Sequence, residues 1–117
     1  MPLRHETLVA CQRADDLFIE VHKLARNRFL RDERFELSSQ IRRAAYSVAA
    51  NIVEGFARRS DNERAHFLNI AEASLAEVGY CLHVARRLGY VDDALYSKLD
   101  IQVRQTAAPL VGLIRTG

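Results

Sequence analysis

Apolar residues recur along this chain in steps of three and four positions, and this spacing limits the fold more than any other feature of the sequence. An α-helix returns to the same face every 3.6 residues, whereas a half-buried strand alternates with a period of two. The first stripe consists of Cys11, Ala14, Leu17, Phe18, Val21, Leu24 and Ala25. It predicts a helix from about residue 6 to residue 28.

The same spacing predicts three further helices. The second covers about residues 37–59, with its inward face at Leu37, Ile41, Ala45, Val48, Ile52 and Phe56. The third follows Ser60 and stops at Gly89, with its inward face at Phe67, Ala71, Ser74, Val78, Cys81, Ala85 and Leu88. The fourth follows Asp92, with its inward face at Leu95, Leu99, Val103, Leu110 and Ile114. Each set forms one seam along its helix.

The predicted helix ends carry their own signals. Ser60 and Glu63 form a capping box, in which the serine hydroxyl accepts from the backbone amide of Glu63. Asp92 is placed to cap the fourth helix, and Gly89 is placed to end the third in a left-handed conformation. Pro109 should kink the fourth helix or end its regular part, because proline has no backbone N–H.

Short connections join these helices, with turns near residues 29–35, at residue 60 and at residues 89–92. Such loops make neighbouring helices antiparallel. An all-β fold is disfavoured because the chain has only 5 Gly and 2 Pro and contains no Asn-Gly or Asp-Gly pair. We therefore predict an all-α, antiparallel up-and-down four-helix bundle that forms a single domain over residues 1–117.

The sequence carries no sign of a membrane or secretory role. Its apolar runs are far shorter than the roughly 20 residues that cross a bilayer, and its N-terminus lacks the apolar core of a signal peptide. Cys11 and Cys81 lie inside helical stripes rather than in a Cys-x-x-Cys pattern, which indicates reduced core thiols. We expect a cytoplasmic protein.

Patterns typical of enzymes and metal sites are also missing. Glu63 and His66 have the Glu-x-x-His spacing of di-iron bundles, but such a site needs a second copy and two further carboxylates. The histidines, at 5, 22, 66 and 83, match no zinc spacing. There is no glycine-rich phosphate loop, nucleophile elbow or Cys/His dyad. We predict that the protein is not an enzyme, uses no cofactor and binds no metal.

Charge is unevenly distributed. The net charge is +2, but the segment from residue 23 to residue 43 alone carries +4, so the rest of the chain is slightly acidic. The chain has 15 Arg and 2 Lys, a bias toward the planar cation that suits phosphate and carboxylate partners. The basic residues of the segment are Lys23, Arg26, Arg28, Arg31, Arg34, Arg42 and Arg43.

Five polar residues stand out on otherwise apolar helical faces. They are Ser47, Asn51 and Glu54 on the second helix and Ser74 and Glu77 on the third. Residues three or four apart share a face, so each group can form a polar row. We interpret these rows as structural rather than catalytic, with helix ends or an arginine of a neighbouring helix, such as Arg42 or Arg43, as partners for Asn51 and Glu54.

The second helix has a further face of small and apolar residues. Ala44, Ala49, Val53 and Gly55 lie beyond the positions that its own core needs. In a bundle helix, this indicates a second buried contact and a close approach of backbones.

Several motifs resemble the four-helix-bundle proteins encoded in intervening sequences of bacterial 23S ribosomal RNA genes. One is Gln-Ile-Arg-Arg-Ala from Gln40, followed by Asn-Ile-Val-Glu-Gly from Asn51 to Gly55. The others are Ala-Glu-Ala-Ser-Leu-Ala-Glu over residues 71–77 and Arg-Arg-Leu-Gly-Tyr-Val ending at Val91. Helical periodicity does not require Gln40, Asn51, Glu54 or Gly55. The sequence departs from the pattern at Leu30 and Ala49, where proline is common, and at Glu36, where glycine is common.

This resemblance implies a ring-shaped homopentamer of up-and-down bundles. It also implies a relationship to the accessory protein of diversity-generating retroelements, which binds nucleic acid and a reverse transcriptase. Ring assembly would give the second face of the second helix a use.

The function we expect is a non-enzymatic oligomeric scaffold that binds RNA or DNA. The expected contacts are Arg26, Arg28, Arg31, Arg34, Arg42 and Arg43, with Arg58 and Arg59 as a second group. Gln40, Asn51, Glu54, Ser74 and Glu77 are expected to be structural. The alternative is a protein–protein adaptor for a partner enzyme, in which the arginines serve only solubility and subunit contacts.

Overall fold

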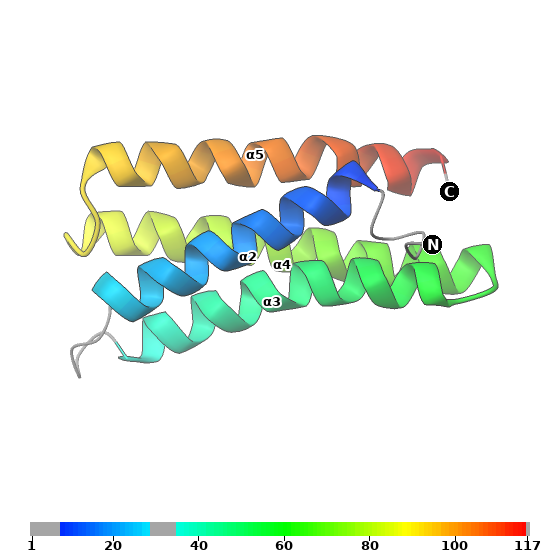
Figure 1. Ribbon diagram of the computed structural model, residues 1–117, viewed down its shortest axis with the longest axis horizontal. Helices are drawn as coiled ribbons and strands as arrows, with labels where there is room; N and C mark the ends of the chain where they lie inside the picture. The colour runs from blue at the N-terminus through cyan, green and yellow to red at the C-terminus, as the bar shows by residue number, and fades with distance from the viewer. Residues whose placement is uncertain (1–7, 29–34, 117) are drawn as a thin grey trace.

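Four long helices make up this protein in its computed structural model (Figure 1). The structure describes the backbone of residues 8–28 and 35–116 and the side chains of residues 8–25 and 36–115. The helices are α2 (Val9–Arg28), α3 (Phe35–Ala57), α4 (Asp61–Arg87) and α5 (Asp93–Thr116). The described residues contain no strand. The predicted all-α, antiparallel up-and-down four-helix bundle is confirmed.

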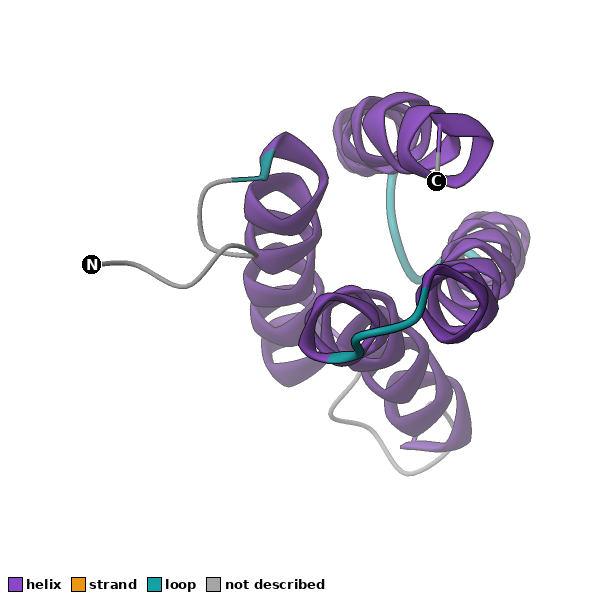
Figure 2. Cartoon of the chain, turned by 90° about the vertical axis from the view of Figure 1, so that its right-hand side faces the viewer, coloured by secondary structure: helices purple, strands orange, loops and turns teal. Residues whose placement is uncertain are grey.

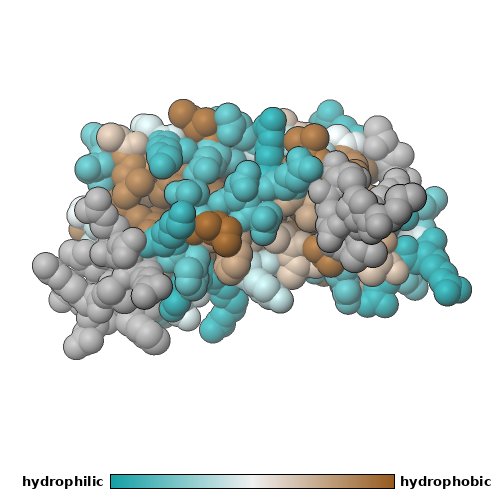
Figure 3. Space-filling model, viewed as in Figure 1, coloured by the Kyte–Doolittle hydropathy of each residue, from teal (hydrophilic) through white to brown (hydrophobic). Residues whose placement is uncertain are grey.

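The helices pack in a closed cycle. α3 contacts α2 and α4, and α5 contacts α4 and α2, while the diagonal pairs do not pack against each other. Figure 2 shows the helices arranged around one centre, with α2 inclined to the others. The outer surface mixes polar and apolar residues on the face seen in Figure 3. A membrane-spanning helix is absent from the described part of the chain.

The buried stripes of α2 and α3 follow the predicted spacing. Ala14, Leu17 and Val21 on α2 and Ile41 and Val48 on α3 are essentially inaccessible to solvent. Phe18 is only half-buried, because it lies at the edge of the stripe and packs against the core from outside. At roughly 25 cal/mol per Å² of apolar surface removed from water, these stripes supply the main stabilisation of the bundle.

The core of α4 is wider than predicted. Besides the predicted seam, Leu68, Leu75 and Leu82 are buried and form a second row seven residues apart. The reason is that α4 packs against two helices, α3 and α5, so it needs two apolar rows rather than one. Leu88 was predicted to face inward, but it is 57% exposed because it lies beyond the last residue of α4, where the chain turns.

The predicted caps are in place. The amide of Glu63 donates to Ser60 Oγ at 3.0 Å, and the amide of Leu95 donates to Asp92 Oδ1 at 2.8 Å. Gly89 has φ +76, a left-handed conformation that favours glycine. Beyond it, the amide of Tyr90 donates back to a carbonyl in the last turn of α4 at 2.8 Å. These local bonds satisfy backbone groups that a helix end leaves unpaired.

Pro109 was expected either to kink the fourth helix or to end its regular part, and the second of these alternatives is wrong. α5 runs without interruption from Asp93 to Thr116. The carbonyl of Gln105, which an N–H at position 109 would have bonded, accepts instead from a side chain of α2. Thr106, a fully buried residue that the periodicity did not mark, donates its hydroxyl to the Gln102 carbonyl at 2.8 Å.

Part of the face of small and apolar residues on α3 is buried inside this chain, which the sequence did not predict. A Cβ on Gly55 would lie 3.3 Å from the carbonyl oxygen of Arg64, so α4 approaches α3 closely at this point. Ala44 is also buried, at 3% exposure. These two residues are therefore used within one chain. Ala49 and Val53 remain half-buried at the surface of α3.

Candidate functional site

The up-and-down topology gathers basic residues at one end of the bundle. The last turns of α2 and α4 and the first turns of α3 meet there (Figure 1). We call this the basic end and define it by Lys23, Arg42, Arg43, Arg86 and Arg87. Arg86 and Arg87 were not among the predicted contacts, and the signal that could have found them is the antiparallel order of the helices. Among the described residues, four acids share this end, Glu20, Glu36, Asp92 and Asp93, and Lys23 lies 3.9 Å from the Glu20 carboxylate.

The arginines of the basic end differ in the contacts that they make within the chain. Arg86 donates to Asp93 at 3.0 Å and lies over the Tyr96 ring at 4.7 Å. Arg42 donates to the Ser38 carbonyl in its own helix at 3.4 Å. Arg43 and Arg87 are exposed, and the described residues offer neither of them a hydrogen bond or an ion pair. Among the described residues, these two guanidiniums thus have no competing anionic partner.

Four predicted arginines cannot be placed in the same way. Arg31 and Arg34 lie outside the described residues. Arg26 and Arg28 belong to the last turn of α2, which ends at the basic end, but their side chains are likewise outside the description.

The second predicted group lies at the opposite end of α3. Arg58 donates to Glu54 at 2.7 Å and also lies over the Phe67 ring, 5.0 Å from its centre. Arg58 is therefore engaged in contacts within the chain although it is exposed, and Arg59 is exposed as well. Arg58 and Arg59 are not brought together with Arg42 and Arg43, since residues 44–57 of α3 lie between the two pairs.

A polar network links α3 to α4. The hydroxyls of Ser47 and Ser74 are 2.8 Å apart, and the Asn51 amide donates to Ser47 Oγ at 2.9 Å and to the Ser47 carbonyl at 2.8 Å. Ser74 is buried, and Ser47 and Asn51 are half-buried. The network satisfies polar groups that would otherwise cost free energy at a helix contact.

Glu54 does not belong to this network. Its partner is Arg58 on the same helix, not Arg42 or Arg43, and its side chain is 47% exposed. The expectation of a carboxylate held by Arg42 or Arg43 is wrong, because those arginines lie three turns away along the same helix. Gln40 makes only a long contact, 3.5 Å, to Glu36.

Beside the network, a polar groove of about 340 Å³ opens between α3 and α4. We call it the α3–α4 groove. Its lining residues are Gln40, Arg43, Ala44, Ser47, Ser74 and Glu77. Four residues predicted to be structural, Gln40, Ser47, Ser74 and Glu77, therefore line a surface cavity rather than a sealed contact. Burial and the negative charge of Glu77 raise the pKa of the neighbouring Cys81 thiol.

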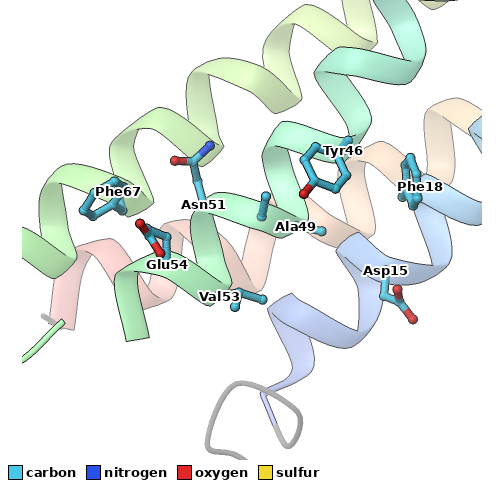
Figure 4. Close-up of a pocket in the computed structure, with 9 residues that line it drawn as sticks. Asp15, Phe18, Tyr46, Ala49, Asn51, Val53, Glu54 and Phe67 are labelled. Atoms are coloured by element: carbon cyan, nitrogen blue, oxygen red, sulfur yellow. The ribbon is translucent and has the colours of Figure 1, made fainter. Parts of the chain in front are cut away.

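A second, larger hollow of about 600 Å³ lies over α3 and is mainly apolar. Ala49 and Val53 form its floor, Phe18 and Tyr46 stand on the α2 side, and Phe67 contributes from α4 (Figure 4). Phe18 and Tyr46 meet edge to face, with ring centres 5.8 Å apart. We call this the apolar cleft.

The family of the chain follows from how much of its sequence one family model matches. The model of the 23S rRNA-intervening sequence protein family matches residues 6–112, nearly the whole sequence. The protein belongs to this family. None of the curated proteins matches it.

A solved structure supports the fold of this intervening-sequence protein. The chain is similar to a protein of unknown function from the S23 ribosomal protein family of Bacteroides thetaiotaomicron. The TM-score is 0.87 at 23% identity, and the match covers 92% of this chain and 96% of the other. At that identity, the likeness establishes the fold alone.

The residues that carried the family resemblance now have physical roles in this intervening-sequence protein. Asn51 bonds Ser47 in the α3–α4 network, and Gly55 permits the close approach of α4. Glu54 pairs with Arg58. Among the described residues, no three His, Cys, Asp or Glu side chains cluster in a way that could hold a metal ion.

Proposed function

We propose that this intervening-sequence protein is a non-enzymatic cytoplasmic scaffold that assembles into a ring, by resemblance a pentamer, and binds RNA or DNA through its basic end. The observation that carries the proposal is that the basic end exposes Arg43 on α3 and Arg87 on α4, and neither has a hydrogen bond or an ion pair to the described residues. A guanidinium presents donors in a planar fork that matches phosphate oxygens. Two such groups on separate helices offer two separate contacts to one phosphate backbone.

Assembly strengthens the attraction. One chain has a net charge of +2, which makes a weak ligand for a polyanion. A closed ring repeats the basic end once per subunit, and the summed potential steers nucleic acid toward it. The apolar cleft supports assembly, because its floor of small residues lets a neighbouring backbone come close.

The competing function is a protein–protein adaptor. The apolar cleft also favours this alternative, since Tyr46 at its edge is 60% exposed and aromatic side chains are common anchors of interfaces. In that case, the partner would bring the chemistry and the arginines would only keep the protein soluble.

A salt-titrated binding assay separates the two functions. The intact assembly, sized by light scattering, is titrated with a structured RNA and with duplex DNA at increasing salt. Phosphate contacts predict that log K on duplex DNA falls with log salt at a slope of about 0.9 per phosphate neutralised. Arg43→Ala and Arg87→Ala should each weaken binding and lower the slope.

Arg115→Ala is the matched control, because it removes the same charge at the other end of the bundle. It should leave the slope unchanged. If neither nucleic acid binds at low salt, where the attraction is strongest, the adaptor is the better function. A stable monomer at micromolar concentration would contradict ring assembly.

A further inference from the structure

The α3–α4 groove carries two opposite charges, and neither has a partner among the described residues. Arg43 on α3 and Glu77 on α4 both line it, and both are exposed. Within the described part of the chain, neither makes a hydrogen bond or an ion pair, with the other or with any third residue. A guanidinium can only donate hydrogen bonds and an ionised carboxylate can only accept them. The groove therefore presents donors on its α3 side and acceptors on its α4 side.

The two charged groups stand at the same height in the groove. Ser47 and Ser74 touch across it, which fixes the register of the antiparallel pair. Arg43 lies four residues before Ser47, and Glu77 lies three residues after Ser74. Since α3 and α4 run in opposite directions, both steps lead the same way along the groove. Ala44 leaves room beneath the charged groups, at 3% exposure.

A ligand that fits this groove must accept hydrogen bonds on one edge and donate hydrogen bonds on another. Guanine meets the requirement: O6 and N7 accept from arginine, and the N1–H and the exocyclic amine donate side by side to a carboxylate. Adenine does not, because its amine neighbours a lone pair at N1 that would face the carboxylate. The cavity of about 340 Å³ lies at the small end of the range of known ligand sites.

We propose that the α3–α4 groove reads a guanine base of single-stranded nucleic acid, with Arg43 and Glu77 on its two edges. The inference rests on the proposed function, because the groove opens beside the basic end and shares Arg43 with it. In a strand bound there, Arg87 of the basic end is left for a phosphate, while Arg43 serves the base in the groove. The Ser74 hydroxyl and the Gln40 amide add polar contacts at the floor and rim.

Equilibrium dialysis of the full chain against GMP and AMP tests this inference. The two nucleotides carry the same phosphate and ribose, so any difference between them reports the base. We expect GMP to bind about tenfold more tightly, in line with one good bidentate base contact. Glu77→Gln should remove the preference, because an amide presents a donor where guanine also donates.

Glu72→Gln is the control, since Glu72 is an exposed carboxylate of the same helix outside the groove. It should keep the preference. Equal binding of GMP and AMP, or a GMP preference that survives Glu77→Gln, would overturn the inference. Neither result bears on the salt-dependent binding of duplex DNA, so a failed guanine site and a failed nucleic-acid scaffold can be told apart.

Discussion

The guanidinium of Arg13 donates a 2.9 Å hydrogen bond to the backbone carbonyl of Gln105, the carbonyl that Pro109 cannot serve. Inside a helix, this oxygen would accept from the N–H four residues later, and proline has none. A side chain of α2 therefore supplies the missing donor on α5. The bond joins helices whose contacting residues lie 92 positions apart in the chain.

Arg13→Ala should lower the free energy of unfolding by about 1 kcal/mol, because the carbonyl loses a charged donor but stays open to water. Pro109→Ala restores the helical N–H, so Arg13→Ala should cost less in that background. Denaturant melts of the four proteins in this cycle measure the coupling. Equal costs in both backgrounds would show that the bond does not compensate for the proline.

Alanine should have opposite effects at two glycines of neighbouring helices. A Cβ at Gly79 meets no atom within 4 Å, so Gly79→Ala should raise the free energy of unfolding by about 0.5–1 kcal/mol through helix propensity alone. A Cβ at Gly55 would lie 3.3 Å from the Arg64 carbonyl oxygen, and backbone yields little. Gly55→Ala should therefore lower the free energy of unfolding by about 1 kcal/mol. Thermal melts compare the two, and stabilisation by both would refute the close approach.

Glu54→Ala should change stability little. The carboxylate is 47% exposed and pairs within its own helix, so its removal should cost under about 1 kcal/mol. Arg58 keeps its place over the Phe67 ring in the variant. A loss of about 3 kcal/mol or more in a thermal melt would indicate a buried ion pair instead.

Cys81 should make stability fall in alkaline solution. Burial and the charge of Glu77 raise its pKa above the value of an unfolded thiol, which is about 8.5. A thiol whose folded pKa is raised stabilises the fold below the unfolded pKa, and that contribution is lost as pH rises above it. Urea melts between pH 7 and 10 should show a shallower decline for Cys81→Ala than for the native chain. Identical declines would rule out a contribution from this thiol.

The sequence by itself determined the helices and most of their ends. Capping by Ser60 and Asp92 and the left-handed turn at Gly89 depend on residues three or four positions apart, so a local pattern suffices to predict them. The apolar period likewise marks one buried stripe for each helix. The antiparallel bundle then follows from short loops.

Only the tertiary structure decided which residues meet across helices. α4 buries a second row of apolar residues because it packs against two neighbouring helices. This row consists of Leu68, Leu75 and Leu82. The proximity of Arg43 to Glu77 in one groove and the bond from Arg13 to Gln105 depend on how each helix is rotated and shifted against the next. Rotation and register are set by the packing of all the apolar stripes at once, which no local stretch of sequence encodes.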